Sequence, residues 1–369
     1  MIEYSFAILF TLAGFIFVDN KQVQQNKGFW IILTWLFLTL LIGLRFQVGG
    51  DTVSYMSDYD WRKGLSDWKF DLTDKYQPGY TLLCAITKSF SPEFYIFQLI
   101  HASIVNTLLF IFINRYTRFF FASLLSVFIT CYLYFTTEIL REVIAVLIFV
   151  LSYKNFEERH WLKYYLAIFV CCLFHVSAIF LIILPFMRKI KINRYYFILL
   201  AITFVAMAFL KNILNTLSQI ALISDKLNQY KDLTSTGLLA DLLTLLRTCI
   251  FPLFFCICVK YISRRNLKFE NMIAIMTILG LAAFFSPIIF YRATNYFILF
   301  FSLSIADFCV QALRQNKLVL RKWAIVLSLC FLIIYGSGYA MYGRYRRWIP
   351  YYSIFNPIQI NRDSYGDNN

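Results

Sequence analysis

Charged residues are scarce in this chain of 369 residues, and acidic residues are the scarcer kind. Only 15% of the residues are charged, whereas 60% are hydrophobic and the mean hydropathy is +0.64. A soluble domain usually has about 25% charged and roughly 45–50% apolar residues. This much apolar surface cannot all face water, so the composition excludes an ordinary soluble domain and indicates an integral membrane protein.

The apolar runs lack the alternation of transmembrane β-strands. Residues 29–44, 119–134 and 238–259 each approach the roughly 20 apolar residues with which a helix crosses a bilayer. Barrel strands would instead alternate over about ten residues. Because only helices and closed barrels satisfy the backbone in lipid, we expect an all-α polytopic fold. The first run, 2–18, lacks the basic start and small-residue cleavage site of a signal peptide, so we expect a retained helix.

Recognisable metal and nucleotide motifs are also missing. None of the nine cysteines forms a Cys-x-x-Cys pair, and no cysteine–histidine cluster has the spacing of zinc ligands. Most of the cysteines lie inside apolar runs, where they act as small hydrophobic residues. No phosphate-binding loop, dinucleotide fingerprint, serine-hydrolase elbow or zinc-protease motif occurs. We therefore expect no metal, no cofactor and no nucleotide substrate.

The net charge of +15 comes largely from short basic loops. Excess lysine and arginine in short loops is typical of the cytoplasmic side of a membrane protein, so we expect no nucleic-acid partner. These loops are at 21–27, 115–118, 154–163, 188–194, 260–268 and 314–322. If all of them are cytoplasmic, the segment 47–77 is an external loop. That loop has six aspartates and four basic residues, a net charge of −2, which agrees with an external position.

This topology predicts about ten membrane crossings in a single integral membrane domain, 1–369. Both termini are then external, with an external tail at 340–369. The crossings are expected near 2–18, 29–46, 94–113, 119–136, 139–152, 195–210, 238–259, 271–289, 293–310 and 323–339.

Two apolar stretches do not fit as simple crossings. Residues 78–90 are too few to span a bilayer, and a full crossing there would place the loop at 115–118 outside, so we expect this stretch to be external or re-entrant. Residues 164–187 join two basic loops that should share a side, so we expect a bent hairpin with its vertex near His175. Broken helices at membrane depth line polar cavities, so both stretches predict a nearby site.

Five polar residues interrupt or border the apolar runs: Arg45, Glu138, Arg141, His175 and Arg292. A charge at membrane depth is costly and usually marks a functional site, and the topology places all five at the external face. Each also has a structural alternative. Arg45 and Arg292 are also compatible with interfacial contacts to headgroups, Glu138 and Arg141 with an ion pair within one helix, and His175 with a buried, hydrogen-bonded histidine.

Arginines gathered at an outer cavity suit a phosphate-bearing ligand, because the guanidinium group binds phosphate oxygens in pairs and stays charged. The tail adds Arg344 and Arg346 to the candidates, with ordinary contact to the membrane surface as the alternative. Tyr55 and Tyr80, near the outer face, are candidates for stacking on sugar rings, with packing as the alternative.

At these residues the sequence resembles the EpsG/Wzy group of bacterial polysaccharide polymerases. The resemblance runs through five short motifs in order, over roughly residues 43–355. They are Gly43-Leu44-Arg45 with Val48-Gly49-Gly50-Asp51-Thr52-Val53-Ser54-Tyr55, Gln77-Pro78-Gly79-Tyr80, Ile139-Leu140-Arg141-Glu142-Val143-Ile144-Ala145, Phe174-His175-Val176-Ser177-Ala178 and Trp348-Ile349-Pro350-Tyr351-Tyr352. Two positions depart from the group: Gln77 stands where glutamate is frequent, and Glu142 where glutamine is frequent.

The resemblance implies a polymerase of oligosaccharide repeat units carried on undecaprenyl pyrophosphate, for O antigen, capsule or exopolysaccharide. It implies a fold like that of the multi-helix, lipid-dependent glycosyltransferases of the GT-C type, in a bacterial inner membrane, with the site facing the periplasm or exterior. Transfer would invert the anomeric centre without a metal. The partners would be the lipid-linked substrates, membrane lipid and a chain-length regulator protein.

This reaction needs two kinds of residue. Arginines must stabilise the leaving pyrophosphate, and the candidates are Arg45, Arg141, Arg292, Arg344 and Arg346. A base must take a proton from the acceptor hydroxyl, and the candidates are His175, Asp51 and Glu138. His175 has the most suitable titration range, and Asp51 has the alternative role of orienting Arg45 or a sugar hydroxyl.

Two other classes of membrane protein remain open. A flippase for lipid-linked oligosaccharide would have internal repeats or paired broken helices, and no clear repeat is present. A membrane acyltransferase that modifies the polysaccharide would need a base, but it would not need several external arginines.

The topology can be tested by cysteine labelling. In a variant without native cysteines, Asp67→Cys should react with a membrane-impermeant thiol reagent on intact cells or spheroplasts. Arg264→Cys should react only after lysis. If the cysteine at 67 reacts only after lysis, the external position of the loop is wrong.

Overall fold

The structure is a computed structural model, described here for residues 2–20, 26–217, 238–264, 266–341 and 345–357. Helices dominate, and within these ranges the only β-type pairing is isolated bridges. The chain forms two compact units. The first is Met1–Ile182 with Tyr335–Asn369, and the second is Ile183–Ile334. Each unit is described by itself.

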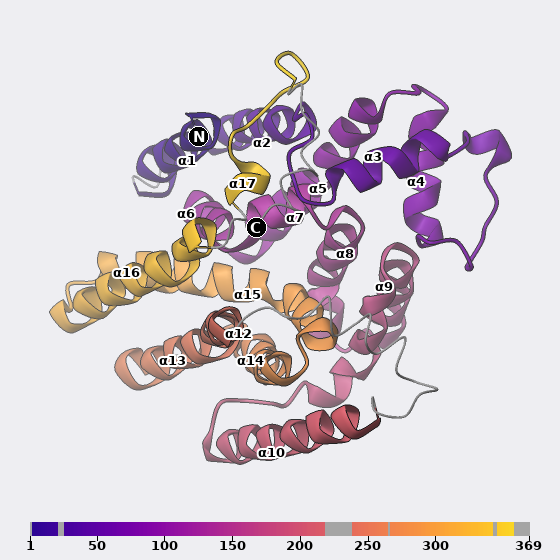
Figure 1. The fold of residues 1–369 in the computed structure, drawn as a ribbon. Coiled ribbons are helices and arrows are strands. Elements are labelled where there is room, and N and C mark those ends of the chain that lie inside the picture. The colour runs from indigo at the N-terminus through magenta and orange to yellow at the C-terminus, as the bar shows by residue number, and fades with distance from the viewer. Residues whose placement is uncertain (1, 21–25, 218–237, 265, 342–344, 358–369) are drawn as a thin grey trace. The chain divides into compact units, whose positions relative to one another are not determined.

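The first unit holds most of the N-terminal helices (Figure 1). Its α-helices are α1 (Ile2–Gly14), α2 (Lys27–Gly43), α3 (Thr52–Trp61), α4 (Pro78–Lys88), α5 (Phe94–Tyr116), α6 (Phe120–Val127), α7 (Leu133–Thr137), α8 (Leu140–Glu157), α9 (Trp161–Phe174) and α17 (Tyr345–Trp348). Its other helical segments are η1 (Phe15–Asn20), η3 (Leu65–Asp67), η4 (Phe128–Tyr132) and the start of η5 (Val176–Met187).

Buried polar side chains join the helices of the first unit. The Gln98 side chain on α5 donates to the carbonyl oxygens of Gly43 and Arg45, both at 2.8 Å. On the same helix Asn106 donates to Thr39 Oγ1 at 3.1 Å and accepts from the Tyr132 hydroxyl at 2.9 Å. Because helix packing between apolar surfaces is not directional, such bonds set the register of α2, α5 and η4 within the apolar interior.

The second unit consists of apolar helical segments. They are α10 (Arg194–Leu217), α12 (Leu238–Leu245), η6 (Leu246–Ile250), α13 (Phe251–Cys258), η7 (Val259–Ser263), α14 (Glu270–Phe285), α15 (Pro287–Arg314) and most of α16 (Leu318–Met341). Glu270 lies at the start of α14, where it pairs with Lys260 Nζ at 2.9 Å and accepts from the Ile192 amide at 2.8 Å. Glu270 and Lys260 therefore tie the loop before α10 to the start of α14 and to η7.

The helical multi-pass architecture is confirmed. Among the described residues, six helices are long and apolar enough to cross a membrane: Ile2–Asp19, Phe94–Tyr116, Phe120–Thr137, Leu238–Ser263, Phe290–Arg314 and Leu318–Gly336. Shorter apolar helices are Lys27–Gly43, Trp161–Phe174, Val176–Met187, Arg194–Leu210 and Glu270–Phe285. Each predicted crossing coincides with a helix, whereas the number of ten crossings and the single domain stay predictions.

Neither of the two stretches that did not fit simple crossings forms a single helix long enough to span a bilayer. Residues 78–88 form α4, whose 11 residues rise only about 16 Å, roughly half the thickness of a bilayer core. In the other stretch α9 ends at Phe174, and His175 is extended with φ −153° and ψ 124°. The Tyr164 hydroxyl then donates to the Leu181 carbonyl oxygen at 2.7 Å. This bond shows that the chain folds back after His175, as the predicted hairpin requires.

Candidate functional site

The turn after α2 is held by the side chain of Arg45. Its Nη1 donates to the Ile42 carbonyl oxygen at 2.6 Å, and its Nε donates to the Val48 carbonyl oxygen at 3.0 Å. Only 1% of Arg45 is exposed. A buried guanidinium group needs hydrogen-bond acceptors, and here the acceptors are carbonyls on both sides of the turn. Arg45 therefore ties the end of α2 to the chain that leads into α3.

Gly49 makes the turn possible. Its φ is +112°, a conformation that residues with a side chain rarely adopt. A Cβ at this position would lie 2.5 Å from the Thr137 carbonyl oxygen. The Gly49 amide donates to the Arg347 carbonyl oxygen at 2.9 Å. The turn is thus enclosed between the end of α7 and the C-terminal segment.

The C-terminal segment, 345–356, returns to the N-terminal helices, and α17 lies in it (Figure 1). The Phe46 amide donates to the Tyr352 carbonyl oxygen at 2.8 Å, and the Ile354 amide donates to the Leu44 carbonyl oxygen at 3.0 Å. The Trp348 indole donates to Thr137 Oγ1 at 2.9 Å. These bonds join the first and last sequence motifs, although about 300 residues separate them.

Arg347, which the sequence analysis missed, reaches the site through this segment. Its Nη1 lies 3.1 Å from Glu138 Oε2, and 51% of its side chain is exposed against 6% for Glu138. Its guanidinium group also lies against Gly50, 3.0 Å from where a Cβ would stand. The feature of the sequence that could have indicated Arg347 is its position directly before the Trp348 motif. The arginines predicted in this tail were Arg344 and Arg346.

Arg141, in the first turn of α8, contacts residues of two further motifs and the ring of Tyr76. Its Nη1 donates to Gln77 Oε1 at 2.8 Å, its Nε lies 3.5 Å from the Tyr55 hydroxyl, and its guanidinium carbon stands 4.1 Å from the centre of the Tyr76 ring. Burial raises the pKa of Tyr55, so its hydroxyl stays neutral beside Arg141. Because Gln77 is also neutral, these contacts hold Arg141 without cancelling its charge.

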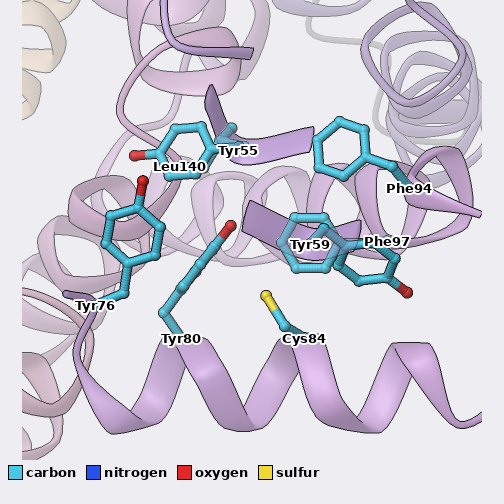
Figure 2. Close-up of a cluster of buried hydrophobic side chains, with 8 residues drawn as sticks. All are labelled: Tyr55, Tyr59, Tyr76, Tyr80, Cys84, Phe94, Phe97 and Leu140. Carbon is cyan, nitrogen blue, oxygen red and sulfur yellow. The ribbon is translucent and has the colours of Figure 1, made fainter. Parts of the chain in front are cut away.

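Tyr55 and Tyr80 lie in an aromatic cluster between α3, α4 and α5 (Figure 2). Tyr80 is 0% exposed, and its ring contacts Tyr55 at 5.7 Å and Tyr76 at 5.5 Å between ring centres. Phe97 on α5 contacts Tyr80 edge to face at 5.7 Å. The cluster packs the loop 47–77 on α5. The sugar contact predicted for the two tyrosines stays a prediction.

His175 lies at the break between α9 and η5. It is buried, and its Nδ1 is 2.6 Å from Ser177 Oγ. Gly79, at the start of α4, packs against the end of α9, because a Cβ there would lie 2.7 Å from the Leu173 carbonyl oxygen. Phe174 packs on the aromatic cluster. The motifs around Gly79 and His175 are therefore adjacent.

Of the three residues predicted as the base, Asp51 is exposed, whereas Glu138 and His175 are buried. Asp51 directly precedes α3, next to Gly50, and its carbonyl oxygen accepts from the Tyr55 amide at 3.0 Å. Asp51 therefore lies in the chain between Gly50, which contacts Arg347, and Tyr55, which contacts Arg141.

The remaining predicted arginines stay untested. Arg292 is exposed on α15 in the second unit. Arg344 lies outside the described residues, and Arg346 is described only as part of the α17 backbone. Within the described part of the chain, no group of three or more histidine, cysteine, aspartate or glutamate side chains could hold a metal ion.

A comparison with family models finds one match, the EpsG family, over residues 28–353. The match covers most of the chain, including all five motifs, the turn after α2, α8 and the C-terminal segment as far as residue 353. No curated protein matches the chain, and no solved structure matches it.

Gly49→Ala should destabilise the first unit. A side chain would be strained at φ +112° and would collide with the Thr137 carbonyl oxygen, at a cost of about 1–3 kcal/mol. Thermal unfolding of the detergent-purified protein should show a lower midpoint. Gly28→Ala is the matched control, because nothing lies within 4 Å of a Cβ at that position in α2. Equal midpoints for the two variants would contradict the role given to Gly49.

Proposed function

The chain belongs to the EpsG family, and from that premise we propose that it polymerises oligosaccharide repeat units carried on undecaprenyl pyrophosphate. Membership of the family supports a polysaccharide polymerase-like role. The finer proposal is an inverting glycosyl transfer at the outer face of a bacterial inner membrane. The product would be O antigen, capsule or exopolysaccharide.

One observation carries the proposal: two partly exposed arginines border the first turn of α3. Glu138 binds Arg347, and Arg141 follows Glu138 by three residues in the chain. Both guanidinium groups are bound to a buried or half-buried partner, so they are oriented before a substrate arrives. Preorganised positive charge is what a departing pyrophosphate requires, because no protein group has to reorient as the negative charge develops.

In the proposed reaction the acceptor is the terminal sugar of a lipid-linked repeat unit. Its hydroxyl oxygen attacks the anomeric carbon of the growing chain, opposite the bond to pyrophosphate. That carbon–oxygen bond breaks, and undecaprenyl pyrophosphate leaves with its electron pair. The hydroxyl proton passes to a carboxylate, for which we propose Asp51. Arg141 and Arg347 meet the charge of the leaving group, so the proposed reaction needs no metal.

The other motif residues receive supporting roles in this proposal. Arg45 is buried and occupied by two carbonyls, so we assign it to positioning the turn rather than to contact with the pyrophosphate. Glu138 orients Arg347. His175 holds the break in the hairpin beside α4. Membrane lipid and a chain-length regulator protein remain proposed partners.

Arg141→Ala should leave an inserted protein that makes little polymer. Loss of one charge-assisted contact to the leaving group costs on the order of a hundredfold in rate. Arg141→Lys should restore the rate only partly, because lysine lacks the planar guanidinium fork that binds two phosphate oxygens side by side. The measurement is a polysaccharide gel from a deletion strain complemented with each variant, normalised to an immunoblot of membranes.

Arg118→Ala is the control for this experiment, because Arg118 is an exposed arginine in a short loop away from the motifs. Wild-type polymer from Arg141→Ala, at the protein level of the Arg118 variant, would contradict the proposed contact with pyrophosphate.

Asp51→Asn tests the base. The amide keeps the shape of the side chain but cannot accept the proton, so the turnover rate should fall by roughly 10²–10⁴ while substrate binding changes little. Asp60→Asn, an exposed aspartate on the same helix, should have no effect. Turnover would be measured with purified protein in nanodiscs and lipid-linked repeat units. If Asp51→Asn keeps its rate and His175→Gln loses it, the base is His175.

A further inference from the structure

A cleft of about 520 Å³ opens in the predicted external loop, between the end of α3 and the chain that leads into α4. Ligand pockets usually enclose roughly 300–1,000 Å³. Four aspartates and four basic residues line it, together with Trp61, Trp68 and Thr81. The lining charges balance, so the cleft has no net attraction for a polyanion such as nucleic acid or a phosphate headgroup. Alternating acceptors and donors instead match the hydroxyl groups of a neutral or weakly charged ligand.

Parts of the cleft wall are fixed before any ligand binds. Arg62 lies between Asp58, at 2.6 Å, and Asp74, at 3.1 Å. The hydrogen bond from Arg62 lowers the pKa of Asp74, so this carboxylate is ionised and can accept hydrogen bonds. The Trp68 indole donates to Thr81 Oγ1 at 3.0 Å, which fixes that ring against α4. A wall held in this way loses little conformational entropy when a ligand binds.

Trp61 is the unusual member of the wall, because 87% of it is exposed. The last residue of α3, it presents a large apolar ring at the rim of a polar cleft. Tryptophan combines a wide apolar face with a single polar group, which suits ligands that have both apolar faces and hydroxyl edges. A pyranose ring has this character, with carbon–hydrogen bonds on its faces and hydroxyls around its rim.

The cleft adjoins the candidate site through the ring of Tyr76. The guanidinium carbon of Arg62, in the cleft wall, stands 5.6 Å from the centre of that ring, and Lys75 Nζ stands 5.0 Å from it. The guanidinium carbon of Arg141 stands 4.1 Å from the same ring. The Tyr76 ring therefore contacts basic groups of both the cleft and the candidate site. A chain-like ligand in the cleft would have one end close to Arg141.

We propose that this cleft binds the sugar chain of the substrate, several rings away from the reacting carbon, with Trp61 stacking on a pyranose face. The inference rests on the proposed polymerase function and adds a subsite that determines how firmly the saccharide is retained between additions. Weaker retention shortens the polymer without preventing a single transfer.

Trp61→Ala tests the subsite, and because Trp61 is exposed the change should leave the fold intact. Leu72→Ala is the matched control, because Leu72 is 76% exposed in the same loop and does not line the cleft. The probe is a set of oligosaccharides of two to four repeat units, released by mild acid from the polymer of the host strain. Calorimetric titration of the full-length protein in nanodiscs should show roughly three- to tenfold weaker binding for Trp61→Ala, in line with the contribution of one aromatic contact. Trp61→Phe should retain most of the affinity.

In cells, Trp61→Ala should shift the polysaccharide ladder to shorter chains while products of one addition persist. Equal affinity and equal ladders for Trp61→Ala, Leu72→Ala and wild type would overturn the subsite. The subsite would also be overturned if Trp61→Ala and Leu72→Ala lowered the amount of this protein in the membrane equally. That result would identify the two side chains as contacts with the membrane surface. If the wild-type gene does not restore polymer to the deletion strain, the proposed function itself fails, and this outcome is distinct from the others.

Discussion

The buried guanidinium group of Arg45 holds the turn on which the candidate site is assembled. An arginine removed from water is costly unless its donors are satisfied, and here the carbonyls of Ile42 and Val48 meet two of them. The chain between these carbonyls is thereby kept in one conformation. Gly49 can then approach Thr137 closely, and the C-terminal segment can donate to and accept from the same turn. Asp51 and α3 follow from it in a defined direction.

The two arginines near this turn differ in the charge of their partners. Arg347 has a buried carboxylate, Glu138, whereas Arg141 is held by the amide of Gln77, the Tyr55 hydroxyl and the Tyr76 ring. A glutamate at position 77, which is frequent in the resembling polymerases, would pair with Arg141 and reduce its attraction for an anion. In this chain the neutral partner orients Arg141 and leaves its charge for a ligand. The departure at Gln77 is therefore compatible with an anion site, and a carboxylate there is not needed for the geometry.

The loop 47–77 contributes in two ways to the same region. Its apolar side packs Tyr55, Tyr76 and Tyr80 on α5, so the loop is part of the folded unit (Figure 2). Its polar side forms the cleft around Arg62. Tyr76 belongs to both sides of the loop, because its ring is part of the aromatic cluster and also contacts Arg62 and Arg141. A saccharide site beside an anion site would suit a substrate that has a sugar chain at one end and a pyrophosphate at the other.

The amino-acid sequence was enough to predict the fold class, the positions of the long apolar helices, the two stretches that are not simple crossings, and the family, whereas α3 and α17 were not predicted. The predicted features follow from hydropathy, charge and motif order, which are properties of short stretches of chain. It also selected Arg141, Asp51 and Glu138, since charges beside apolar runs are visible without a structure. The folded structure was needed to learn which of these side chains are exposed, that Arg45 is buried, and that Arg347 pairs with Glu138. Arg347 and Glu138 are 209 positions apart, and the turn of Arg45 contacts a segment about 300 positions away, so no local pattern contains these outcomes. Burial is set by whichever distant segment packs against a side chain.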